Sequence, residues 1–241
     1  MFNNLDEKNL FKGIGAILLY FFATILLQIP FIFFTENQYI ILLVPYTIVL
    51  ITFILLYKKD LKKDLKDFKK NYKKILLTTF KYWLIGFIIM IALSFIINLL
   101  PIKEVLNQED NKNLLNTYPL IEIAIAVIIA PIAEEIAFRL SFRKFTKNKW
   151  AFALTTGLLF GFIHILSSLI QYGNPLYLIY LLPYGTLGTV FGLAYAKTDN
   201  IYGTMTFHAL HNVLSILELL IIGGVILWQK KNLKQDPKNM K

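Results

Sequence analysis

Long apolar runs are the feature that most constrains how this chain can fold. Each run has about 20 residues with few or no charges, which is the length that a helix needs to cross the ~30 Å hydrocarbon core of a bilayer. Hydrophobic residues make up 56% of the 241 residues, more than a soluble globular domain carries. The sequence therefore predicts one all-α integral-membrane domain over residues 1–241, a bundle of about seven or eight transmembrane helices. The seven runs cover residues 13–34, 39–57, 81–100, 119–138, 150–170, 175–196 and 201–222.

The net charge of +10 comes mainly from lysines that lie between the apolar runs. The segments 1–12, 58–74 and 139–149, together with Lys197, hold 17 of the 25 lysines and arginines. The alternate connections, 35–38, 101–118 and 171–174, hold only Lys103 and Lys112. Because short cytoplasmic loops of membrane proteins are enriched in Lys and Arg, we expect a multi-pass protein with a cytoplasmic N-terminus. Only two of the 25 are arginines, which favours an AT-rich bacterial genome and hence a bacterial cell membrane.

The segment 58–74 carries nine lysines interrupted by three aspartates. We expect this basic cytoplasmic loop to form a solvated surface helix that contacts anionic lipid headgroups. A nucleic-acid partner is not expected, because the basic residues are divided among the loops of a membrane protein.

The C-terminal tail conflicts with this orientation. It carries five lysines, and an odd number of spans places it outside. An eighth short crossing or re-entrant turn around residues 218–228, broken at Gly223 and Gly224, would return it to the cytoplasmic side. The sequence leaves both possibilities open.

Two pairs of glycines have the spacing of helix-packing motifs. Gly157 and Gly161, and then Gly188 and Gly192, form GxxxG patterns that allow helix backbones to approach closely. The alternative is that they reflect the general abundance of glycine in membrane helices.

Charged residues inside an apolar run are expensive and normally face a protein interior or a water-filled cavity. The stretch APIAEEIAFRLSFRKF places Glu134, Glu135 and Arg139 at the end of the fourth run. Glu135 and Arg139 are four residues apart, so they share a helix face and can pair. Glu134 points about 100° away and is expected to lack that partner and to project into a cavity. Alternatively, both acids lie solvated at the headgroup level.

All three histidines of the chain also lie in apolar runs. They are His164, His208 and His211. Under the orientation above, His164 and His208 lie at a depth similar to that of Glu134. A single buried histidine is more often a packing residue than a catalyst, but that explanation must be repeated for each histidine and each acid. We therefore predict one shared polar site.

These residues form three ordered motifs that resemble those of the CAAX protease and bacteriocin-processing family of intramembrane proteases (CPBP, or Abi). The motifs are E-E-x-x-x-R at Glu134, Glu135 and Arg139, F-x-x-x-H at Phe160 and His164, and H-x-x-x-N at His208 and Asn212. The resemblance covers residues 119–216, the expected catalytic core, and His211 is not part of it. We expect His211 to be a packing residue or a partner of the site.

The resemblance implies an intramembrane endopeptidase whose catalytic residues are Glu134, Glu135, Arg139, His164, His208 and Asn212. Glu134 would take a proton from water, and His164 would hold that water or pass the proton to the leaving amine. His208 and Asn212 would donate hydrogen bonds to the carbonyl oxygen as it becomes negative. We expect no cofactor and no metal site. Two histidines and a glutamate are nevertheless a known zinc ligand set, so zinc stays open, although the sequence has no H-E-x-x-H motif and no cysteine.

Two other classes remain as alternatives. A proton-coupled transporter would also keep acids and histidines inside the bundle, but the sequence shows no convincing internal repeat. A non-catalytic bacteriocin immunity or scaffold protein would use the fold without the chemistry. The expected partner of the protease is a membrane-bound peptide or protein, whose identity and cleavage site the sequence does not indicate. It does not indicate the oligomeric state either.

Overall fold

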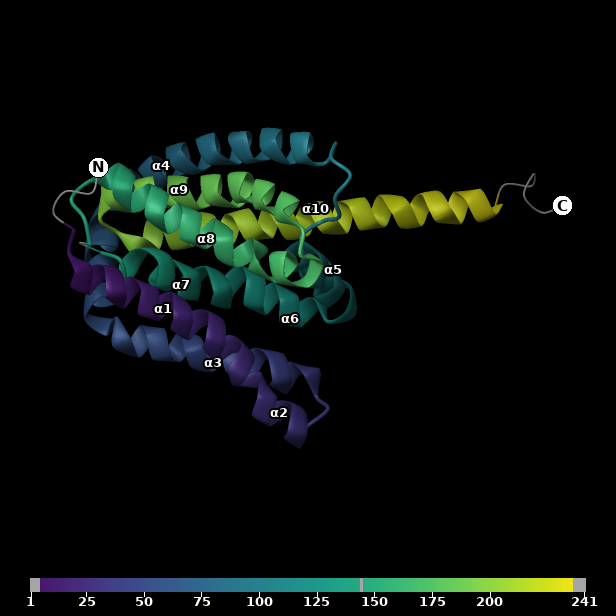
Figure 1. Ribbon diagram of the computed structural model, residues 1–241, viewed down its shortest axis with the longest axis horizontal. Helices are drawn as coiled ribbons and strands as arrows, with labels where there is room; N and C mark the ends of the chain where they lie inside the picture. Colours follow the sequence, from purple (N-terminus) through teal and green to yellow (C-terminus); the bar gives the residue numbers. More distant parts are fainter. Residues whose placement is uncertain (1–4, 144, 236–241) are drawn as a thin grey trace.

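The computed structural model describes the backbone of residues 5–143 and 145–235, with side chains up to residue 221. Within these residues the chain forms helices and no strands, which confirms the all-α membrane class. The helices pack side by side as a bundle (Figure 1). They are α1 (Glu7–Leu26), α2 (Gln28–Phe34), α3 (Gln38–Leu56), α4 (Lys58–Ile97), α5 (Leu106–Thr117), α6 (Pro119–Ile123), η1 (Ala124–Ile129), α7 (Ala130–Glu135), η2 (Ile136–Leu140), α8 (Lys149–Tyr172), η3 (Pro175–Tyr180), α9 (Leu181–Thr198) and α10 (Ile201–Gln235).

Six helical segments of the described chain are long and apolar enough to cross a membrane. They correspond to six of the seven predicted runs. The remaining run, 119–138, is helical too, but it is divided between α6, η1, α7 and η2. The six segments are Glu7–Phe34, Gln38–Leu56, Lys58–Ile97, Lys149–Tyr172, Pro175–Thr198 and Ile201–Ile221.

The lysine-rich segments meet at one end of the bundle. The backbone N–H of Asp6 donates to the carbonyl of Phe145 at 2.7 Å, which joins the N-terminus to the 139–149 segment. Arg143 Nη2 lies 3.0 Å from Asp64 Oδ1 and 2.9 Å from Asp199 Oδ1. The four segments that were grouped by charge therefore share one side. That this side is cytoplasmic stays a prediction.

Arg143 is the centre of that junction. Its Nη2 also donates to the backbone carbonyl of Asp199 at 2.8 Å. Burial alone would lower the pKa of Arg143, but nearby Tyr195 and the carboxylates of Asp199 and Asp64 raise it above its ordinary value. The guanidinium therefore stays charged and ties α4 to the turn between α9 and α10.

The basic segment 58–74 forms the first part of α4, as expected for a surface helix. Its nine lysines are exposed, while Leu61 and Asp64 face the bundle. The helix kinks at Asn71, whose backbone angles (φ −119°, ψ 15°) are not helical. The kink lies near the end of the lysine-rich part, three residues before Lys74.

The last helix is longer than the bilayer requires. α10 runs without interruption from Ile201 to Gln235, through Gly223 and Gly224, so the re-entrant turn considered there is not formed. At 1.5 Å per residue its 35 residues span about 52 Å. In Figure 1 it projects beyond the other helices, at the end opposite to the N-terminus.

The GxxxG spacings correspond to close packing of α8 against α9. A Cβ atom added at Gly188 would meet the backbone of Gly157 at 2.9 Å, and one added at Gly192 would meet Ala153 Cα at 2.7 Å. A Cβ at Gly161 would meet the backbone N of Gly185 at 2.9 Å. These glycines are therefore specific contacts between two helices, which brings the α9 backbone close to the site described next.

Candidate active site

The two acids are carried by an irregular helix. Glu134 and Glu135 end α7, a six-residue α-helical segment between the π-helical segments η1 and η2. Pro131 has no N–H and cannot donate the usual helical hydrogen bond. π-Helical turns occur frequently at functional sites, where they change the direction of side chains. The sequence analysis expected a regular span and missed this feature.

Glu135 and Arg139 form the predicted ion pair. Glu135 Oε1 lies 3.0 Å from Arg139 Nη1, and both side chains are fully buried. Arg139 Nη2 donates to the carbonyl of Gly188 at 3.1 Å, and the guanidinium lies 4.9 Å from the centre of the Phe160 ring. The pair therefore connects η2 to α8 and α9.

His208 lies between the two acids. Its Nδ1 is 3.0 Å from Glu135 Oε1, and its Nε2 is 3.5 Å from Glu134 Oε2. Because Glu135 is ion-paired with Arg139, its carboxylate accepts a hydrogen bond from Nδ1–H. That bond fixes the imidazole and directs Nε2 toward Glu134. The expected meeting of the first and third motifs is thus observed.

Glu134 has a partner that the sequence analysis did not identify. The hydroxyl of Tyr20, on α1, donates to Glu134 Oε1 at 2.9 Å in a buried contact. Glu134 was expected only to lack Arg139 as a partner, and Arg139 indeed pairs with Glu135 instead. Helical spacing relates only residues of one helix, and Tyr20 comes from another helix 114 residues earlier.

His164 lies in the aromatic surroundings of the site and forms no hydrogen bond with either acid among the described residues. Its Nδ1 is 2.8 Å from the carbonyl oxygen of Phe160, so Nδ1 carries the proton and Nε2 is the acceptor. Its ring packs on Phe160 (centroids 4.2 Å apart) and stacks on Tyr184 (5.0 Å). Phe160 also contacts the ring of His208 at 5.7 Å. Phe160 therefore joins the second motif to the third.

Two residues of α10 point to other partners. The side-chain amide of Asn212 donates a hydrogen bond to the carbonyl of Ala126 in η1 at 2.7 Å, so Asn212 supports the irregular helix. The ring of His211 packs edge-on against Phe87, with the ring centroids 5.9 Å apart.

The donor atoms of the acids and histidines bear on whether the site could hold a metal ion. Across the part of the chain that the structure describes, no group of three or more His, Cys, Asp or Glu side chains is placed to hold one. In the set considered for zinc, Glu134, His164 and His208, three of the four imidazole nitrogens already face other groups. His164 Nδ1 faces a carbonyl oxygen, and both nitrogens of His208 face carboxylates.

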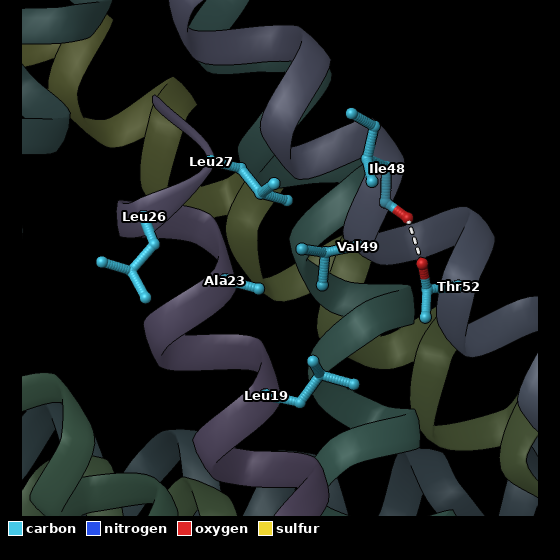
Figure 2. A pocket seen from close by; sticks show the side chains of 7 residues that line it. All are labelled: Leu19, Ala23, Leu26, Leu27, Ile48, Val49 and Thr52. Carbon is cyan, nitrogen blue, oxygen red and sulfur yellow. Dashed lines mark hydrogen bonds between the residues drawn. The ribbon is translucent and has the colours of Figure 1, made fainter. Parts of the chain in front are cut away.

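An apolar groove runs beside the helix that carries Tyr20. It has a volume of about 330 Å³ between α1 and α3, and Figure 2 shows its lining. Its one polar side chain, Thr52, donates to the carbonyl of Ile48 at 2.8 Å. The lining residues are Leu19, Ala23, Leu26, Leu27, Ile48, Val49 and Thr52, so the groove includes neither Glu134 nor His208.

Comparison with known proteins gave one match. Residues 116–214 match the family model described as type II CAAX prenyl endopeptidase, Rce1-like. The match covers less than half of the chain but includes every motif residue from Glu134 to Asn212. No curated protein and no solved structure matches the chain. The segment that carries the candidate site is therefore Rce1-like, and the resemblance to the CAAX protease and bacteriocin-processing family is confirmed.

Proposed function

We propose that this protein is an intramembrane endopeptidase that hydrolyses peptide bonds with a water molecule activated by Glu134. The observation that carries the proposal is the 3.5 Å approach of Glu134 Oε2 to His208 Nε2 in a buried setting. The other end of each group is fixed, that of Glu134 by Tyr20 and that of His208 by Glu135. A carboxylate and an imidazole held face to face provide a base and a hydrogen-bond donor for one reacting centre.

The chemistry assigns one task to each group. Glu134 removes a proton from water as the water oxygen attacks the scissile carbonyl carbon. Negative charge then develops on the carbonyl oxygen, and His208 in its doubly protonated form donates Nε2–H to it. When the C–N bond breaks, the proton held by Glu134 passes to the leaving amine, either directly or through the unprotonated Nε2 of His164.

Glu135 and Arg139 act by holding His208. The ion pair keeps the acceptor oxygen of Glu135 at His208 Nδ1, so the imidazole does not rotate away from Glu134. The amide of Asn212 donates to the carbonyl of Ala126 at 2.7 Å. It can donate to the carbonyl oxygen of the substrate only if that bond breaks. We assign it first to the support of η1.

The substrate is a peptide or protein that resides in the membrane. The family description names prenylated CAAX proteins, and a bacterial chain would instead act on leader peptides or membrane-protein tails. An immunity or scaffold protein, or a transporter, would keep its function without cleaving any peptide.

Peptidomics of the native host tests the proposal. Cells with the wild-type chain are compared with cells that carry Glu134→Gln or Glu122→Gln. Glu122 is a buried acid of α6, in the same helical run as Glu134. We expect fragments that disappear in Glu134→Gln and persist in Glu122→Gln. If no fragment depends on Glu134 while the phenotype of a deletion is fully restored by Glu134→Gln, the chain acts without proteolysis.

A further inference from the structure

A cavity that the proposed reaction does not use lies beside the kink of α4, with Asn71 in its lining. It has a volume of about 410 Å³ and lies between α4 and the C-terminal end of α9. We infer that it binds the phosphate of an anionic phospholipid headgroup. Its polar lining consists of Asp67, Asn71, Lys74, Thr78, Lys197 and Thr198.

The cavity brings together two cations from different helices. Lys74 comes from α4, just after the kink, and Lys197 from the last turn of α9. Within residues 5–143 and 145–221, neither amine forms an ion pair. Thr78 and Thr198 line the same space, although the hydroxyl of Thr198 already donates to the carbonyl of Ala194 at 2.8 Å. The ammonium groups of the two lysines are donors suited to phosphate oxygens.

The one acid of the lining is engaged elsewhere. Asp67 Oδ1 accepts from Asn71 Nδ2 at 2.7 Å, and Asp67 Oδ2 accepts from Asn200 Nδ2 at 3.0 Å. Both of its oxygens are therefore satisfied by amides, and Lys74 and Lys197 remain for a ligand. Two cations and one carboxylate leave a formal charge of +1 on the lining, which suits a singly charged phosphodiester.

The position of the cavity along the bundle favours a lipid over a soluble anion. It lies at the end where Arg143 joins α4 to the turn between α9 and α10. The exposed lysines of 58–74 end there, and the apolar part of α4 begins with the buried Ile75. This boundary between charged and apolar surface is where headgroup phosphates lie, and lysines near it keep their amines in the polar layer.

Native mass spectrometry with a matched charge control tests this inference. Purified protein is titrated with phosphatidylglycerol and, separately, with phosphatidylcholine. The double variant Lys74→Gln/Lys197→Gln is compared with Lys59→Gln/Lys70→Gln, which removes the same charge from exposed lysines of α4 that do not line the cavity. We expect one tightly held phosphatidylglycerol, whose Kd rises about tenfold in the first variant. The second variant should change the Kd by less than about twofold.

Three results would overturn the inference. If the Kd for phosphatidylglycerol rose equally in both double variants, the lipid would be attracted diffusely to a basic surface. If the protein bound inorganic phosphate but formed no adduct with phosphatidylglycerol, the cavity would be a site for a soluble anion. The single variant Lys197→Gln, on the other helix, should weaken binding in the same direction by a smaller factor. A Kd unchanged in both Lys197→Gln and the double variant would place the lipid elsewhere.

Discussion

Tyr20 donates a 2.9 Å hydrogen bond to Glu134, so α1 contributes directly to a site whose motif residues all lie between residues 116 and 214. The bond occupies Oε1 of Glu134 and leaves Oε2 facing His208. The N-terminal helix is thus part of the candidate active site, although no motif residue lies in it.

Tyr20→Phe keeps the aromatic ring and removes only the hydroxyl. A base that rotates out of position loses rate more than substrate affinity, so we expect kcat to fall about tenfold or more with KM changed by less than about twofold. Tyr195→Phe is the control, because Tyr195 lies in the same buried cluster and its hydroxyl has no hydrogen-bond partner in the described chain. Equal kcat and KM for the two variants would show that Tyr20 does not position Glu134. The proposed role of Glu134 as the base would not be affected.

Arg139→Met should destabilise the protein strongly. It leaves the fully buried Glu135 without its cation, and breaking one partner of a buried ion pair typically costs about 3–5 kcal/mol. The double variant Glu135→Gln/Arg139→Met should recover part of the loss, because no unpaired charge remains. Thermal unfolding in detergent measures both. A midpoint for Arg139→Met equal to that of the wild type would show that the pair is not buried as described.

Gly188→Ala should disturb both packing and the site. The added Cβ would lie 2.9 Å from Gly157 Cα, which forces α8 and α9 apart and moves the carbonyl that Arg139 contacts. We expect a lower thermal midpoint together with reduced cleavage. Gly15→Ala is the matched control, since a Cβ there meets nothing within 4 Å and alanine is a better helix former than glycine. Its thermal midpoint should be unchanged or higher.

Removal of metal should not reduce cleavage. In the described residues the acids and histidines do not form a three-ligand set, and the proposed base acts directly on water. Elemental analysis of purified protein, with cleavage measured before and after chelation, checks this. Stoichiometric zinc whose removal abolishes cleavage, and whose return restores it, would require a rearranged site.

The chain has no cysteine, so its topology can be tested by single-cysteine labelling. Lys70→Cys lies in the exposed basic part of α4, and Lys112→Cys lies on α5, in the connection 101–118. With a cytoplasmic N-terminus, a membrane-impermeant maleimide should label intact cells at residue 112 and label residue 70 only after the cells are opened. The reverse pattern would invert the orientation.

Local spacing predicted the parts of the site that lie on one helix. Four-residue spacing was sufficient for the Glu135–Arg139 pair, because both residues follow one helical turn. The contact of Tyr20 with Glu134 depends on how α1 packs, and no pattern within either helix records it. The π-helical turns beside α7 and the bond from Asn212 to Ala126 likewise depend on tertiary packing.

Charge distribution predicted the arrangement of the loops well, because lysine position is controlled by the membrane rather than by packing. The segments grouped by charge are joined in the structure through Arg143 and Asp6. The course of α10 was harder to predict. Glycines end helices in water but are tolerated within membrane helices, so Gly223 and Gly224 did not distinguish a turn from a continuous helix.

The most direct test of the account is the rate at which purified protein in lipid vesicles cleaves a peptide found to depend on Glu134 in cells. Glu134→Gln keeps the size of the side chain and its ability to accept from Tyr20, but it cannot take a proton from water. We predict that cleavage falls at least about 100-fold in this variant, as expected for loss of a general base, and stays near the wild-type rate in Glu122→Gln. Cleavage by Glu134→Gln at the wild-type rate would contradict the account.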